Sequence, residues 1–306
     1  MRTAEQPFER GGGRERVVVV KSLIDKVRSF FLESSQPINP DSERFRARYG
    51  NEMVDDDLAK VKKRKQDNAE KEAKKTEEGR EQKQIADLFE ALVNDLIGRF
   101  NWMGSEVDTF TSSDFDDLFN GVDVIAEIHE EIHEEDAGTQ AVSHLALAVD
   151  VAFALDVSEK MKHIQENIDK GTLTRVKYFE SDFLPPEQKG LSNVPRVVIG
   201  LEQETVIALG KIWCNEDREG NKEKIRRHGA QMVILKEVEG QLRYFAEYAR
   251  MKNREEIAET YEKTLTIIRK IVAEKEKEGI TAGDFEEDRV SRAILREARR
   301  LSAGTA

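Results

Sequence analysis

The stretches GVDVIAEI (residues 121–128) and HLALAVDVAFA (residues 144–154) decide the fold. Both are short, apolar and rich in valine and other β-forming residues, which favours strands. The second run is apolar at almost every position except Asp150, a pattern typical of a central strand that is covered on both faces. The sequence therefore predicts a sheet in the middle of the chain, with helices packed around it.

Further elements are expected on both sides of these two strands. Residues 84–100 place their apolar side chains on one helical face, and residues 158–170 predict a second helix that Gly171 ends. Other short runs have the alternation or the apolar content of strands. They are residues 106–111, 174–180 and 196–201, followed by a short expected helix at residues 204–213. The fold class that follows is α/β with a mixed central sheet.

The N-terminal part of the chain is expected to be helical and then highly charged. Residues 17–32 predict an amphipathic helix that Pro37 and Pro40 end. Residues 55–84 are nearly all polar or charged, which indicates a solvated helix or a flexible linker. Within them, the basic stretch Lys60–Lys65 offers an alternative interpretation as a contact for nucleic acid.

The C-terminal part carries two apolar seams at helical spacing, in residues 235–249 and 257–271. They predict a helical hairpin that packs on its own domain, or a coiled coil through which the chain dimerises or binds a protein partner. Together these patterns suggest four regions. These are an N-terminal amphipathic helix (1–40), a charged helix or linker (41–83), an α/β core (84–214) and a helical hairpin or coiled-coil extension (215–306).

Charge is distributed unevenly along the chain, whose net charge is -12. Residues 84–214 hold 25 acidic and 9 basic residues (-16), against 17 and 20 (+3) before them and 19 and 20 (+1) after them. An acidic domain repels phosphate backbones unless cations compensate, so composition disfavours nucleic acid as a simple partner of the middle region. The same acids are compatible with a divalent-cation site.

Cysteine content and hydropathy exclude other classes. The single cysteine, Cys214, forms no internal disulfide and no CxxC zinc motif. No apolar run reaches the 18 or so residues that a membrane span requires, so no membrane association is expected. The cytoplasm is the expected compartment.

Three acidic residues stand at distinctive places in this order of elements. Glu90 lies on the helix of residues 84–100, Asp123 begins a strand just after Gly121, and Asp150 interrupts the long apolar strand. An ionised carboxylate in such a run needs a cation, hydrogen-bond donors or a proton. An acid at a matching height on a neighbouring strand would complete a pocket of oxygens suited to Mg²⁺.

The order helix, strand, strand, strand, helix, strand, with acids at these positions, resembles the PD-(D/E)XK nuclease superfamily over roughly residues 84–200. The resemblance implies an αβββαβ nuclease-like core in which Glu90, Asp123 and Asp150 bind Mg²⁺ or Mn²⁺. It further implies that the metal activates water to hydrolyse a phosphodiester bond in DNA or RNA. An inactive core of this type, kept as a scaffold that works through its helices, is the alternative.

The superfamily's third motif ends with a lysine two residues after the acid, and that position is Ala152 in this chain. The resemblance then implies that a lysine elsewhere stabilises the attacking hydroxide or the phosphate. Lys160 and Lys162 on the helix of residues 158–170, and Lys177 on the next strand, are the candidates for this catalytic role.

Two further motifs leave alternatives open. Asp114, Asp116 and Asp117 precede a strand, where acids often accept hydrogen bonds from backbone amides, although they would also extend a cation site. The string His129-Glu130-x-x-His133 matches HExxH, which on a helix places two histidines on one zinc ion with the glutamate as general base. The competing interpretation of this string is the solvated tip of a hairpin between two strands.

Overall fold

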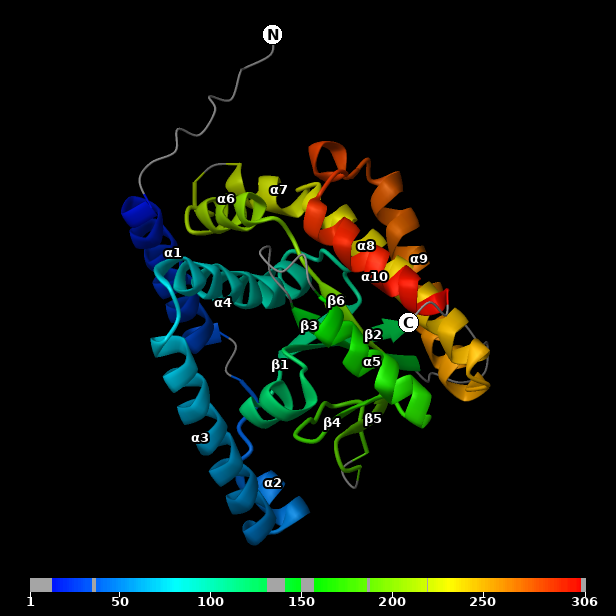
Figure 1. Ribbon diagram of the computed structural model, residues 1–306. Coiled ribbons are helices and arrows are strands. Elements are labelled where there is room, and N and C mark those ends of the chain that lie inside the picture. Colours follow the sequence, from blue (N-terminus) through cyan, green and yellow to red (C-terminus); the bar gives the residue numbers. More distant parts are fainter. Residues whose placement is uncertain are drawn as a thin grey trace.

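A four-stranded mixed sheet lies at the centre of the molecule (Figure 1). Its strand order is β1 (Val107–Thr111), β2 (Val124–Glu130), β3 (Ala141–Val149) and β6 (Arg196–Ile199). The first three strands pair antiparallel, whereas β6 runs parallel to β3. A parallel neighbour needs a crossover connection, and helix α5 (Ser158–Lys170) provides it.

This computed structural model describes residues 13–34, 37–130, 141–149, 157–185, 188–218 and 220–303. Over these ranges the chain is a mixture of helix and sheet, which confirms the predicted class at that level. Within the same ranges, no helix is both long enough and apolar enough to cross a membrane. Asp150, Ala152 and His133 lie outside the described residues.

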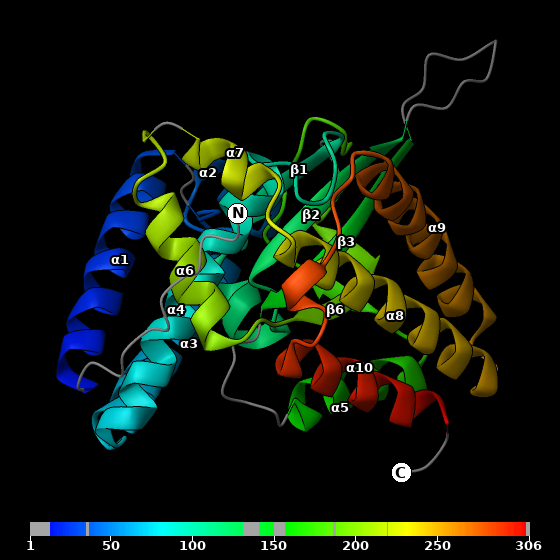
Figure 2. The ribbon, with the colours of Figure 1, turned by 90° about the horizontal axis from the view of Figure 1, so that it is seen from above.

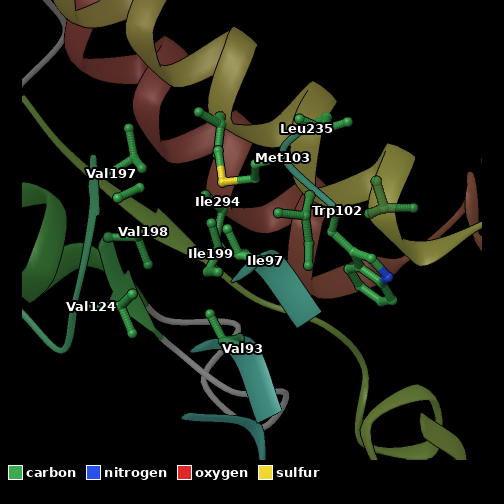
Figure 3. Close-up of a cluster of buried hydrophobic side chains, with 14 of the residues drawn as sticks. Val93, Ile97, Trp102, Met103, Val124, Val197, Val198, Ile199, Leu235 and Ile294 are labelled. Carbon is green, nitrogen blue, oxygen red and sulfur yellow. The ribbon is translucent and has the colours of Figure 1, made fainter. Parts of the chain in front are cut away.

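Helix α4 (Glu77–Gly98) covers one face of the sheet. Thr76 caps it by accepting a hydrogen bond from the Gly79 amide, so the helix begins seven residues before the expected start at residue 84. Its apolar residues belong to the same buried cluster as Val124, Ala126 and Ile128. These three are alternate residues of β2, so their side chains point to the same face of the sheet. Figure 3 shows part of this core. The main buried cluster extends from Val20 to Leu301, so both ends of the chain contribute to it.

The opposite face of β2, which carries Ile125, packs against a small hairpin of β4 (Thr174–Val176) and β5 (Leu191–Val194). The predicted strand of residues 174–180 is therefore shorter than expected and pairs outside the main sheet. The backbone amides of Lys177 and Tyr178 donate to the Asp116 carboxylate at 2.7 and 2.9 Å instead of to a strand. At these two residues the Asp116 side chain takes the place of the backbone acceptors that a neighbouring strand would provide.

The N-terminal region contains α1 (Gly13–Ser34), α2 (Glu43–Tyr49) and α3 (Asn51–Ala73). Helix α1 packs on α4 and α6 (Gln203–Trp213), as expected for an amphipathic helix. Residues 55–84, predicted to be a solvated helix or a flexible linker, are mostly helical and form the greater part of α3 and the first turns of α4. One side of α3 is buried through Val54, Asp57 and Val61, so this charged helix is attached to the domain.

The C-terminal region is helical, with α7 (Asn221–Arg226), α8 (Ala230–Met251), α9 (Glu255–Lys277), a 3₁₀ turn η2 (Gly283–Phe285) and α10 (Arg289–Ser302). Helices α8 and α9 form the expected hairpin, and α10 packs beside α8 (Figure 2). The seam from Ile257 to Ile271 is buried inside the chain, with its apolar residues at most 7% exposed. It is thus taken up by the domain itself and is not a free dimerisation surface.

Candidate functional site

Three acidic side chains meet near the end of the sheet at which β2 begins; we call them the carboxylate cluster. Glu90 comes from α4, Asp117 from the short π-helix η1 (Asp116–Asn120), and Asp123 from the residue before β2. The carboxyl groups of Asp117 and Asp123 share a hydrogen bond, and both acids act electrostatically on their neighbours in the cluster. Two of the three predicted ligands, Glu90 and Asp123, are therefore brought together.

The turn between η1 and β2 makes this approach possible. Gly121 ends η1 in the left-handed conformation, at φ 62°, and its amide donates to the Asp117 carbonyl. A Cβ atom at this position would stand 2.7 Å from Nη2 of Arg196. Glycine is thus required both by the backbone conformation and by the guanidinium packed against the turn.

The cluster shifts the acidity of its own members. Desolvation by the surrounding protein, together with repulsion by Asp123 and Asp117, raises the pKa of Glu90 to about 8. Desolvation, followed by the charge of Asp123 and the hydrogen bond between the two groups, raises the pKa of Asp117 to about 7. Because the Glu90 side chain keeps contact with solvent, water partly offsets both effects on its pKa.

Two cations stand close to these acids. Lys83, one helical turn before Asp87 on α4, forms an ion pair with it at 2.8 Å, and its charge opposes the pKa increase of Glu90. Arg196, at the start of β6, is only 7% exposed, and its Nη1 donates to the Asn120 carbonyl at 3.4 Å. Its Nε is buried without a hydrogen-bond partner, and burial lowers the pKa of this guanidinium while Asp123 favours the charged form.

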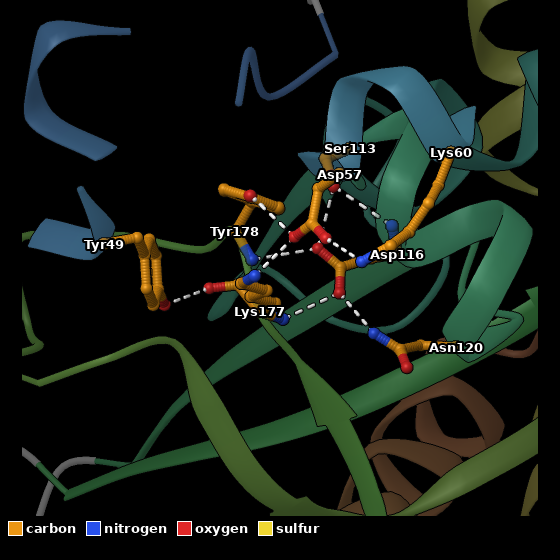
Figure 4. A network of polar contacts seen from close by, with 8 residues as sticks. All are labelled: Tyr49, Asp57, Lys60, Ser113, Asp116, Asn120, Lys177 and Tyr178. Carbon is orange, nitrogen blue, oxygen red and sulfur yellow. Dashed lines mark hydrogen bonds and ion pairs between the residues drawn. The ribbon is translucent and has the colours of Figure 1, made fainter. Parts of the chain in front are cut away.

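A second acidic network lies on the other side of η1 (Figure 4). Asp116, which is fully buried, accepts hydrogen bonds from Ser113 Oγ, from Asn120 Nδ2 and from the two backbone amides of Lys177 and Tyr178. It therefore plays the backbone-accepting role predicted for the acids before the strand. Its neighbour Asp117 lies with Glu90 and Asp123, and its predicted role as an extension of a cation site stays a prediction.

Asp57 of α3 continues this second network. Its carboxylate pairs with the ammonium of Lys177 and accepts hydrogen bonds from Tyr178 Oη at 3.0 Å and Lys60 Nζ at 2.9 Å. Burial alone would raise the pKa of Asp57, but these donors outweigh it and the pKa is lowered. Lys177 also lies about 5 Å from the ring centroids of Tyr49, Tyr178 and Phe115. Its charge is thus already neutralised.

The remaining predicted site residues are spread out. Lys160 is half-buried and Lys162 exposed, both on α5, and Lys177 is held by Asp57. The third predicted ligand, Asp150, lies outside the described residues, just after the last described residue of β3, Val149. Strand β3 is described as far as Val149, two residues beyond Leu147, which pairs with Val124 of β2.

The donors of the carboxylate cluster fit a hard cation. Its oxygen ligands suit Mg²⁺ or Mn²⁺, which commonly take one or two carboxylates together with waters and substrate oxygens. Within the described ranges, no group of three His, Cys, Asp or Glu side chains is arranged so that it could hold a metal ion by itself. Glu90, Asp117 and Asp123 thus offer part of a ligand set.

His129 and His144 lie in strands of the central sheet. His129 and Glu130 lie in strand β2, where successive side chains point to opposite faces, whereas the HExxH arrangement requires a helix. His129 Nε2 contacts Asp108 at 3.1 Å, and His144 Nε2 contacts the buried Glu127 at 2.7 Å. The antiparallel pairing of β2 with β3 agrees with the hairpin interpretation of this string, whose tip, residues 131–140, lies outside the described residues.

Comparison with known proteins adds no identification. No family model, no curated protein and no solved structure matches this chain.

Sequence reasoning did not find Lys83, Arg196 or the Asp57 network. For Asp57 a signal was present, since it shares one helical stripe with the apolar Val54 and Val61, three and four residues away. Arg196 likewise stands directly before the apolar run of β6. A charged residue on an apolar stripe, or at the head of an apolar strand, predicts a buried partner.

Proposed function

We propose that this chain is a divalent-metal-dependent phosphodiesterase that hydrolyses DNA or RNA at the carboxylate cluster. The observation that carries the proposal is that Asp123, distant in sequence from Glu90, lies close enough to it and to Asp117 to raise the pKa of both. Structural acids normally acquire donors or cations, as Asp57 and Asp116 have done. Glu90 and Asp117 instead have other carboxylates as the charged neighbours that raise their pKa most, which is typical of a site that binds a cation.

The electrostatics support a role for Mg²⁺ or Mn²⁺. With pKa values of about 8 for Glu90 and about 7 for Asp117, protons reduce the repulsion in the cluster near neutral pH. A divalent cation would replace these protons and offset the same negative charges. When bound, such an ion supplies an acidified water and charge stabilisation for the phosphate.

The side chains of this chain would then have separate tasks. Glu90 and Asp123 would bind the cation, and Asp117, which shares a hydrogen bond with Asp123, would stand beside it as the acceptor of a proton from the attacking water. Lys160 and Lys162 stay candidates for contact with the phosphate. Lys177 is the weakest of the three lysine candidates, because it would have to leave Asp57 and its aromatic neighbours.

The two alternatives have less support. A zinc hydrolase built on His129 and His133 needs a helix, and His129 lies in a strand. A scaffold acting through the C-terminal seam needs that seam to be accessible, and its apolar residues are buried. A scaffold that uses another surface is the competitor that the experiment below must address.

Cleavage of labelled DNA and RNA, single- and double-stranded, in Mn²⁺ tests the proposal. We expect the wild-type chain to cut, and Asp123→Asn and Glu90→Gln to lose at least about 100-fold in rate, because each removes a negative ligand from the cation site. Asp150→Asn tests the third predicted ligand in the same assay. Asp284→Asn, which changes an exposed acid on the turn η2, is the matched control and should keep its activity.

Circular dichroism and urea unfolding must show that each variant is folded. Equal cleavage by the wild type and Asp123→Asn would overturn the proposed site. A folded wild-type chain that cuts none of the substrates would favour the scaffold. Cleavage that requires zinc and is lost in His133→Ala would favour the zinc hydrolase.

A further inference from the structure

A strongly basic part of α3 lies beside the carboxylate cluster. Residues 58–66 contain five basic residues, Lys60, Lys62, Lys63, Arg64 and Lys65, and no acidic one. All five side chains are exposed. This basic segment contacts the region around η1 directly, since Lys65 Nζ lies 2.6 Å from Asp114 and the Arg64 guanidinium lies 5.5 Å from the ring centroid of Phe119.

The basic segment is held in this place by buried contacts of the same helix. Asp57 is tied to Lys177 and Tyr178, and Val61 is 6% exposed. Figure 4 shows Asp57 and Lys60 next to Asp116 and Asn120, which belong to η1. Because η1 also carries Asp117, the cations of α3 and the acids of the cluster lie on either side of one short helix.

An exposed aromatic ring of η1 lies beside the basic segment. Phe119 of η1 is 40% exposed, one of five large apolar side chains exposed to that degree among the described residues. The ring of Phe115 supports it, with 5.1 Å between centroids. The exposed ring of Phe119, with the Arg64 guanidinium beside it, offers a flat face on which a base can stack.

We propose that the basic segment and Phe119 form the binding surface for a single-stranded nucleic acid, the substrate class of the site. This rests on the proposed function. Lys62, Lys63, Arg64 and Lys65 contact successive phosphates, and a base stacks at Phe119. The strand then continues across η1 toward Asp117, where the carboxylate cluster receives a phosphodiester.

The chemistry of the surface selects both the polyanion and its single-stranded form. Five cations without an intervening acid attract a phosphate backbone, and they compensate locally for the acidic middle of the chain. The Lys65–Asp114 pair is half-exposed on both sides, so a phosphate can take the place of Asp114 at little cost. An aromatic ring can stack on a base only when that base is not already stacked between its neighbours along the strand. The interior of a duplex keeps its bases stacked and therefore does not allow this contact.

Fluorescence anisotropy with labelled 12-nucleotide DNA and RNA, as single strands and duplexes, tests this surface. The assay contains EDTA, so that binding is measured without catalysis. We expect single strands to bind more tightly than duplexes. For Lys62→Gln/Lys63→Gln we expect the slope of log K against log salt to fall by about 1.4, or roughly 0.7 for each phosphate contact. For Phe119→Ala we expect a roughly five- to hundred-fold loss of single-strand affinity.

Matched controls change the same residue types elsewhere. Lys263→Gln/Lys277→Gln removes two exposed cations from α9, and Phe183→Ala removes another exposed phenylalanine, 46% exposed. Both should bind as the wild type does. Asp123→Asn should also bind single strands at least as well, because it removes a negative charge without touching the basic segment.

The outcomes separate this inference from the proposed function. Binding that is equal for single strands and duplexes, or unchanged in the α3 and Phe119 variants, would overturn the surface. Displacement of the nucleic acid by polyglutamate at equal charge would also overturn it, in favour of an acidic protein partner. Cleavage that persists while these variants bind normally would leave the catalytic proposal standing without this surface.

Discussion

Asp116 and Asp117 are neighbours in one short helix, yet their surroundings are opposite. Asp116 is fully buried and has four hydrogen-bond donors, two of them backbone amides. Asp117 shares a hydrogen bond with another carboxyl group, and its pKa is raised to about 7. A single residue step along η1 thus separates an acid that joins parts of the fold from an acid that repels its neighbours.

The difference shows that acids inside a fold can be distinguished by the hydrogen-bond donors and charges around them. An acid with a full set of donors stabilises a particular connection, here between η1 and the chain at Lys177 and Tyr178. An acid that lacks donors and faces other acids costs free energy in the folded chain. Such a cost is typical of a site whose partner is a cation. The predictions below test this contrast, from the largest expected effect to the smallest.

Asp116→Asn should destabilise the fold by about 3–5 kcal/mol. An asparagine oxygen can replace only part of the acceptor capacity, and its NH₂ group would face buried donors, each costing about 1–3 kcal/mol. Urea unfolding at pH 7 measures the change. Asp117→Asn is the matched variant and should be neutral or stabilising, since it removes repulsion. Equal losses in the two variants would contradict the contrast.

Asp57→Asn should destabilise by about 2–3 kcal/mol, because it leaves the Lys177 ammonium, only 14% exposed, without its countercharge. The expected loss lies below that of a fully buried pair, since the rings of Tyr49 and Phe115 still face the cation. Asp55→Asn, on the exposed side of the same helix, is the control. Urea unfolding should show the loss in Asp57→Asn and about none in Asp55→Asn.

Mn²⁺ should stabilise the wild-type chain by about 1.4 kcal/mol at tenfold excess over its dissociation constant. The gain should be larger at pH 8 than at pH 6, because the cation must displace protons from Glu90 and Asp117. Thermal unfolding with and without Mn²⁺ measures it, with Asp123→Asn as the variant that should lose the effect. A gain independent of both pH and Asp123 would argue against the carboxylate cluster as its source.

The smallest expected effect concerns pH. The pKa values of Glu90 and Asp117 are raised in the folded chain, so between about pH 4 and pH 8 the unfolded chain binds fewer protons at these groups. Their contribution to stability therefore decreases as the pH rises through this window. We expect less than about 1 kcal/mol, since water screens the accessible Glu90. Glu90→Gln should flatten the dependence of unfolding free energy on pH, and an unchanged profile would remove Glu90 from the cluster.

Much of the architecture could be predicted from local patterns. The helix at residues 158–170 matches α5, the apolar run at 122–128 overlaps β2, and the run at 196–201 contains β6. These predictions succeeded because apolar periodicity reports which face of an element is buried. The strand at residues 174–180 was predicted too long, since Asp116 takes two of its amides, and no local pattern records that acceptor.

The candidate site was predictable only in part. Glu90 and Asp123 were chosen from their places in the order of elements, and they do lie together. Their partners Lys83 and Arg196 were not found, and Lys177 is occupied by Asp57 of α3. A charged side chain acquires its role from neighbours that are far away in sequence, so spacing alone could not distinguish Lys177 from Lys160.

The sequence by itself determined where this chain forms helices and strands and which of their faces are apolar, because those properties depend on residues a few positions apart. Only the tertiary structure decided that the seam at residues 257–271 packs internally and that α3 is attached beside η1. It also decided that Asp116 is satisfied while Asp117 meets Glu90 and Asp123. The strength of an electrostatic interaction depends on distance and on exclusion of water, and both are set when remote segments pack together.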